Sequence, residues 1–220
     1  MISRDQVRTF EQLRQEAQDP DAVFEEVFRA VLKSLVSDLA SMPYYVRERS
    51  VVNLFVFGHL VPKFQEKGLD IRQICIEEGM QKHQDSEKAR HGRYADIVVW
   101  PHQMATLWRS CKPLAVIEWK NISCREKDGE NPSGLRADHK KDIEFLERNA
   151  DLISIGYAVL SDQRSMRVEL ECTRVSLKSS TRMPVLECSA TYLKDECEKL
   201  QGPLKKIGAK KQACPICIPA

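Results

Sequence analysis

Two apolar runs near the middle of the chain carry charged residues within them. The first is Tyr94–Trp100 (YADIVVW) and the second is Leu114–Lys120 (LAVIEWK). Both runs have the length and the β-branched composition of buried strands. A charge inside such a strand is costly unless it is paired, hydrogen-bonded or bound to a metal. Asp96 in the first run, with Glu118 and Lys120 in the second, are therefore candidate functional residues.

Three segments with helical character precede these runs. A short polar helix is expected over residues 3–18. Apolar residues at helical spacing then predict an amphipathic helix that starts with Asp21 as its N-cap and ends near Met42. This helix suits either packing on the core or a dimer surface. Residues 44–66 are apolar nearly all round, which predicts a second, more buried helix that Gly68 ends.

Glu48 lies in or near the first turn of that second helix. It shares one helical face with Val52, Phe55 and His59. Its carboxylate is therefore placed to lie along the surface that packs on the strands, where it would be a third acidic candidate. The alternative is a solvent-facing carboxylate that is favoured by the dipole of the helix N-terminus.

The remaining pattern predicts an α/β fold. A strand is expected over 71–80, a helix of about 139–150 capped by Asp138, and further elements at 152–160, 167–175, 185–188 and 191–201. The first three strands suit an antiparallel meander. The connection from 120 to 152 contains a helix, as a crossover to a parallel strand requires.

Composition is that of one globular domain with accessory helices. The chain has 220 residues, of which 42% are hydrophobic and 30% charged, with a net charge of +2. There is no signal-peptide pattern and no run near the roughly 20 apolar residues of a membrane span. We therefore expect a cytoplasmic protein that does not enter a membrane.

Most of the eight cysteines are scattered, but Cys214 and Cys217 have the spacing of half a zinc site. Four ligands are needed, so two chains would have to share one ion. A free or redox-sensitive pair is the alternative. The surrounding tail is basic, with Lys205, Lys206 and Lys210 among its cations.

Alternation along the strands brings the charged candidates together. Glu118 and Lys120 should share a face with Leu114 and Val116, whereas Trp119 points into the opposite layer. If the two runs pair, Asp96 lies beside Glu118. Two close carboxylates repel each other unless a cation sits between them.

Mg²⁺ suits this arrangement because it prefers one or two carboxylates with waters and phosphate oxygens. The backbone carbonyl of Trp119 would supply a further oxygen. A metal held by Asp96 and Glu118 can acidify a water and stabilise charge on a phosphodiester. The ammonium of Lys120 would hold that water or stabilise the transition state.

The set Asp96, then Glu118-Trp119-Lys120, resembles the PD-(D/E)xK nuclease superfamily. The element order also resembles that family's restriction-endonuclease-like αβββαβ core, which has a mixed central sheet flanked by helices. Ala95 replaces the Pro of the motif name. In many members an acidic residue on the first core helix completes the site, and Glu48 occupies that place.

The resemblance implies a phosphodiester hydrolase that uses Mg²⁺ or Mn²⁺ and acts on DNA (in occasional members on RNA), and it suggests a homodimer. It divides the chain into an N-terminal helical extension (1–43), the nuclease-like core (44–175) and a C-terminal extension with the basic tail (176–220). One alternative is an inactive nuclease fold that binds nucleic acid or serves in assembly. Another is a protein-interaction domain with a buried ion pair in place of the site.

Four residues near the start of the helix expected at 139–150 form a candidate nucleic-acid-binding patch. Cations at a helix N-terminus oppose its dipole, and a phosphate ligand there would reverse that penalty. An ordinary solvated cluster is the alternative. The patch consists of Arg136, His139, Lys140 and Lys141.

Overall fold

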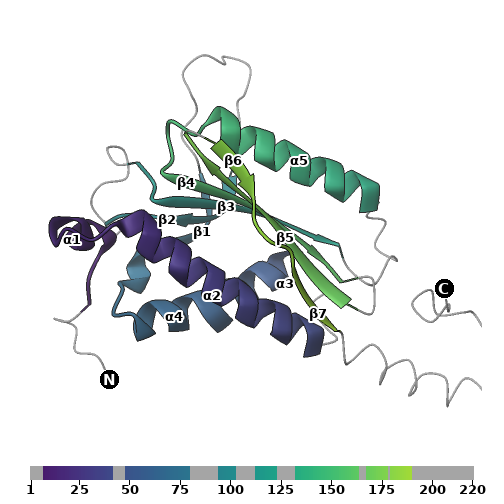
Figure 1. Ribbon diagram of the computed structural model, residues 1–220, viewed down its shortest axis with the longest axis horizontal. Coiled ribbons are helices and arrows are strands. Elements are labelled where there is room, and N and C mark those ends of the chain that lie inside the picture. Colours follow the sequence, from purple (N-terminus) through teal and green to yellow (C-terminus); the bar gives the residue numbers. More distant parts are fainter. Residues whose placement is uncertain are drawn as a thin grey trace, which may run out of the picture.

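The computed structural model describes residues 7–41, 48–79, 94–102, 112–122, 132–163, 167–177 and 179–189. It shows an α/β fold in which helices flank a mixed sheet of seven strands (Figure 1). The helix predicted at 191–201, the basic tail and the Cys214/Cys217 pair lie outside the described residues.

Helices form most of the N-terminal part of the described chain. They are α1 (Phe10–Gln15), α2 (Pro20–Ser41), α3 (Glu48–Asn53), the π-helix η2 (Leu54–Leu60), α4 (Val61–Glu66), the 3₁₀ turn η3 (Ile71–Gln73) and, after the third strand, α5 (Pro132–Arg148). The strands are β1 (Ile74–Gly79), β2 (Tyr94–Val99), β3 (Ala115–Ile122), β4 (Ile155–Asp162), β5 (Arg167–Ser176), β6 (Ser179–Arg182) and β7 (Leu186–Ser189).

The strand order is β1-β2-β3-β4-β5-β6. Strand β7 also pairs with β5, at residues 167–170, whereas β6 pairs with residues 173–176 of β5. Strands β1, β2 and β3 form the predicted antiparallel meander. Strand β4 is parallel to β3 and follows α5, so the predicted crossover is also confirmed. Strand β6 was not predicted, and its four residues are all exposed.

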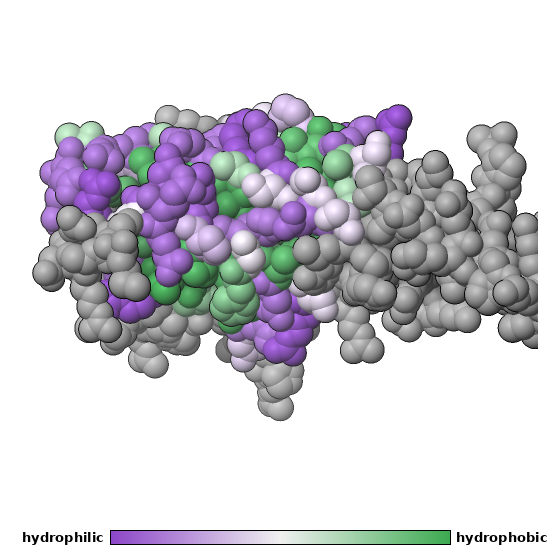
Figure 2. Space-filling model, turned by 90° about the horizontal axis from the view of Figure 1, so that it is seen from below, coloured by the Kyte–Doolittle hydropathy of each residue, from purple (hydrophilic) through white to green (hydrophobic). Residues whose placement is uncertain are grey.

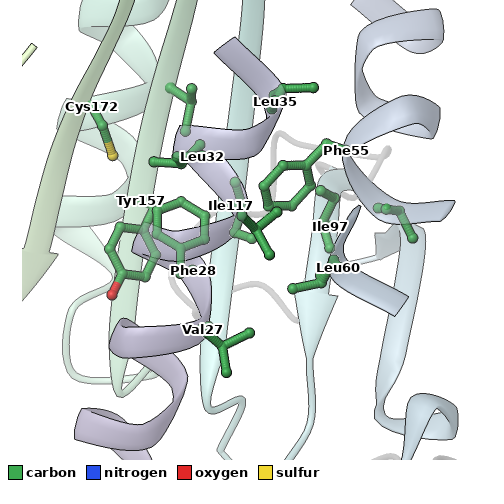
Figure 3. Close-up of a cluster of buried hydrophobic side chains, with 14 of the residues drawn as sticks. Val27, Phe28, Leu32, Leu35, Phe55, Leu60, Ile97, Ile117, Tyr157 and Cys172 are labelled. Carbon is green, nitrogen blue, oxygen red and sulfur yellow. The ribbon is translucent and has the colours of Figure 1, made fainter. Parts of the chain in front are cut away.

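Apolar clusters cover both faces of the sheet. The larger one joins α1, α2, α3, η2 and α4 to the sheet, and within it the rings of Phe28 and Tyr157 stack with centroids 4.0 Å apart (Figure 3). The smaller one lies under α5, where Leu146 packs with Val116 and Ala158. On the face of the molecule seen in Figure 2, hydrophilic and hydrophobic residues are interspersed. The charged residues of β2 and β3 thus belong to a sheet that is covered on both sides.

Several predicted helix boundaries are wrong. Helix α2 begins at Pro20, and the carboxylate of Asp19 accepts the Asp21 N–H at 3.0 Å, so Asp19 is the capping residue. Proline suits the first helical position because its missing N–H would have no helical partner there. Helix α5 likewise begins at Pro132, not near 139. Asp138 therefore lies inside the helix instead of capping it.

The two earliest helices also differ from expectation. Of the described residues in 3–18, only Phe10–Gln15 form helix, with Thr9 as the N-cap. The single helix expected over 44–66 contains the π-helical turns of η2, and its Gly68 end is confirmed by a φ of 65° at that residue. The strand expected from residue 71 begins at Ile74, after the turn η3.

Candidate active site

Strand β3 is the centre of the candidate site. All its residues except Lys120 are buried, including Glu118, which is 2% exposed. Trp119 packs against Phe55 of η2, with ring centroids 5.2 Å apart, whereas Val116 belongs to the cluster under α5. The predicted alternation therefore holds within the strand and places Glu118 on the α5 side. Leu114 does not follow it: this residue precedes the strand and joins the larger cluster.

Asp96 lies where strands β2 and β3 stop pairing. The described pairs end at Ile97 and Ile117, and the next positions in this register are Asp96 and Glu118. The Trp119 N–H donates to the Asp96 carboxylate at 2.6 Å. A side chain here accepts a strand N–H that a backbone carbonyl would otherwise bind. The predicted approach of Asp96 to β3 is thus present in the structure.

Lys120 joins residues from three elements. Its ammonium donates to the Trp119 carbonyl oxygen at 2.7 Å. Its Nζ also lies 3.5 Å from Oε1 of Glu48, in the first turn of α3, and 3.4 Å from Oδ2 of Asp142 in α5. The structure therefore brings Glu48 to the other three candidates and adds Asp142, which sequence reasoning missed.

The charges at this site are unbalanced. Burial raises the pKa of Glu48 to about 7; the Lys120 ammonium opposes the rise, and the charges of Asp96 and Asp142 add to it. Burial disfavours the charged form of Lys120, but the surrounding carboxylates outweigh that effect and raise its pKa. Four carboxylates thus share one ammonium, since Glu118 also acts on Lys120.

A buried polar network fixes the end of β3 to β4. The indole N–H of Trp119 donates to Oγ of Ser161 at 3.1 Å, and that hydroxyl donates to Oδ1 of Asn121 at 2.7 Å. The amide of Gln163 donates to the same oxygen at 2.8 Å. These polar side chains are at most 1% exposed. The network holds Trp119 on its own face and so keeps Glu118 and Lys120 on the other.

The four residues proposed to bind nucleic acid do not gather at a helix start. Arg136 pairs with Asp162 at 3.0 Å and Glu171 at 2.9 Å, and Lys141 pairs with Asp138 at 2.7 Å. The other two differ in exposure: His139 is 8% exposed, and Lys140 is exposed. Their predicted place in the first turn is wrong because α5 begins at Pro132.

The donor set of the site is compatible with a hard cation. In the described part of the chain, no three or more His, Cys, Asp or Glu side chains form a ready metal-binding group. Asp96 and Glu118 nevertheless follow the last pair of β2 and β3 at facing strand positions, and the Trp119 carbonyl accepts the Lys120 ammonium at 2.7 Å, a position of favourable potential for a cation. Oxygen ligands with excess negative charge are what Mg²⁺ and Mn²⁺ bind.

Comparison with protein-family models, with curated proteins and with solved structures found no match. Among the described helices, none is both long and apolar enough to cross a membrane. A function therefore has to be inferred from the chemistry of the chain's own residues.

Proposed function

We propose that this protein is a divalent-metal-dependent nuclease that hydrolyses phosphodiester bonds in DNA. The observation that carries the proposal is the meeting of Glu48, Asp96, Glu118 and Lys120 at one end of β3. They come from α3, β2 and β3, which are far apart in the sequence. A charged cluster of this kind costs free energy to bury, so it indicates a functional role and not a contribution to stability.

The fold supports the same proposal. The run α3–η2–α4 precedes the meander β1–β2–β3, and α5 leads to the parallel strand β4. This is the αβββαβ order of a restriction-endonuclease-like core, and the acidic residues lie where β2 and β3 diverge. We assign the chain to that fold as part of the proposal.

Each residue of the site then has a role. Asp96 and Glu118 would hold Mg²⁺ or Mn²⁺ together with the Trp119 carbonyl, and Glu48 is a further ligand. When bound, the cation supplies an activated water and Lewis-acid stabilisation of phosphate charge. The Lys120 ammonium orients the attacking water and stabilises the negative charge that develops on phosphorus-bound oxygen. Water adds to phosphorus as the P–O bond to the leaving oxygen breaks; the water gives a proton to solvent, and the leaving oxygen takes one from solvent.

Cleavage of DNA by Glu118→Gln and Lys120→Met variants tests the proposal. We expect each change to reduce cleavage with Mg²⁺ or Mn²⁺ by at least about 100-fold, because each removes a group that acts on the transition state. Lys63→Met is the matched control, since Lys63 lies on α4 and pairs with Glu66 on the same helix. Circular dichroism verifies folding. Full activity of Lys120→Met would refute the mechanism.

A second candidate is a nucleic-acid-binding or assembly module of the same fold without catalysis. It is favoured by the contacts of Lys120, whose ammonium already lies between Glu48, Asp142 and the Trp119 carbonyl. Such a module would bind DNA in a salt-dependent way. It would not cleave DNA, whichever divalent metal is added. The cleavage assay, run beside a binding titration at two salt concentrations, separates the two candidates.

A further inference from the structure

Asp142 is the residue of the site that no sequence pattern indicated. It lies in the middle of α5, and its side chain is 3% exposed. We infer that Asp142 is a positioning residue that fixes the ammonium of Lys120 at the candidate active site. Its effect on catalysis rests on the proposed function, whereas its effect on Lys120 does not.

Of the two carboxylates that pair with Lys120 in the described residues, Asp142 is better anchored than Glu48. The Glu48 carboxylate is at a similar distance, 3.5 Å against 3.4 Å, but its side chain is 36% exposed. Water therefore screens the Glu48 contact more strongly than the Asp142 contact. Glu48 is also assigned to the cation in the proposed mechanism. Asp142 is then the carboxylate that keeps its contact with Lys120 when Glu48 acts elsewhere.

The packing of α5 holds Asp142 rigidly. Leu146, one turn further along the helix, is fully buried against β4. At Gly156 of β4, an added Cβ would lie only 3.1 Å from Cδ2 and 3.2 Å from Cβ of Leu146, so helix and strand are in close contact. Lys120 meanwhile has a long, flexible stem that would otherwise sample many rotamers. A rigid carboxylate on a packed helix restricts this freedom and aims the ammonium.

The two helices also approach Lys120 from opposite sides. Helix α5 packs on one face of the sheet, and α3 belongs to the layer on the other face (Figure 1). The Lys120 side chain lies between the two helices and is only 18% exposed. Asp142 therefore supplies the α5 side of a clamp whose other side is Glu48.

A double-mutant cycle in unfolding tests the contact without metal or substrate. Urea midpoints are measured in EDTA for the wild type, Asp142→Asn, Lys120→Met and the double variant. We expect Asp142→Asn to lower the midpoint clearly more when Lys120 is present than in the Lys120→Met background. The contact with the ammonium is what the asparagine loses, so the substitution costs less when the ammonium is already absent. Lys120→Gln replaces Lys120→Met if the latter does not fold. Equal shifts in the two backgrounds would overturn the inference.

Steady-state cleavage with Mn²⁺ tests the consequence for catalysis. Asp142→Asn should lower kcat by about tenfold or more and leave KM within about twofold, because a misplaced ammonium weakens transition-state contacts selectively. Asp142→Glu should recover part of kcat. Glu144→Gln is the matched control: it is the same carboxylate-to-amide change on the same helix, and Glu144 is exposed.

The two readouts separate this inference from the proposed function. A wild-type protein that cleaves no DNA but shows the expected cycle would refute the nuclease and leave the Asp142–Lys120 contact established. A wild type that cleaves DNA, with Asp142→Asn equal to it in kcat, would refute the positioning role and leave the nuclease intact.

Discussion

At the scale of single residues, the balance of charge around Lys120 decides what the site can do. Its ammonium faces Glu48 and Asp142, and Asp96 and Glu118 also act on it. One cation does not offset four carboxylates in a buried place. Burial is the main cause of the raised pKa of Glu48, the charges of Asp96 and Asp142 add to it, and a divalent cation would offset those charges.

The raised pKa of Glu48 predicts a particular pH dependence of stability. The pKa of Glu48 is about 7 in the folded protein, against an ordinary value of 4.5 for a glutamate side chain. The folded state therefore holds the proton more tightly, and this contribution is complete below pH 4.5 and lost as pH rises through about 7. Because the side chain is 36% exposed, we expect a loss of only about 1 kcal/mol.

Glu48→Gln is the variant that checks this dependence. Urea unfolding in EDTA between about pH 5 and about pH 8 should show a smaller decline in the free energy of unfolding than in the wild type. The same change at Glu144, which is exposed on α5, is the control and should keep the wild-type decline. Parallel pH curves for the wild type and Glu48→Gln would contradict the assignment.

The sequence indicated most of these residues because charged side chains are unusual inside apolar strands. Asp96, Glu118 and Lys120 interrupt apolar runs, and strand alternation gives their faces. Asp142 interrupts nothing, since it follows His139, Lys140 and Lys141 in a polar helix. Asp142 is buried only because of the way α5 is oriented. That orientation is set by packing against other elements, which a local sequence pattern does not encode.

At the scale of elements, the close contact of α5 with β4 sets the geometry of the site. Gly156 has Ile153 and Leu146 atoms 3.1 Å from where a Cβ would be. A larger residue would push the helix away from the sheet. Such a shift would move Asp142, on the same helix, relative to Lys120 on the neighbouring strand β3.

Gly156→Ala should therefore destabilise the protein. We expect a loss of about 1–3 kcal/mol in the free energy of unfolding, because the new methyl group overpacks a tight contact. Gly58→Ala is the matched control: Gly58 is exposed, and its Cβ would meet only the tip of Leu54, at 2.9 Å. Its cost should be under about 1 kcal/mol in the same urea titration. Equal stabilities of Gly156→Ala and the wild type would show that α5 is free to move.

Element types were more predictable from the sequence than element boundaries. The strands β2 and β3 follow from apolar runs, whereas the start of α5 at Pro132 was hidden by Gly134 and by neighbouring turn-forming residues. The π-helix η2 has no sequence signal that periodicity detects, since its residues are apolar on almost every side. Strand β6 is polar and exposed, so its pairing with β5 supplies what its side chains do not.

At the scale of the whole molecule, the sheet brings N-terminal helices together with the last strands of the described chain. Helix α2 contacts the far strands β5 and β7, and α5 covers the opposite face of the sheet (Figure 1). The α/β class, the meander and the parallel crossover could be predicted because local patterns fix their order. The addition of β6 and β7 along β5, and the closeness of Glu48 to Lys120, depend on packing that no local pattern encodes.

We propose that α3, β2 and β3 together form one divalent-cation site. Anomalous diffraction from a crystal of the wild-type protein grown with Mn²⁺ measures this directly. We predict a single strong peak bonded to carboxylate oxygens of both Asp96 and Glu118, and its loss in Glu118→Gln. A crystal at saturating Mn²⁺ with no peak between these carboxylates, and with Lys120 still between Glu48 and Asp142, would contradict the claim.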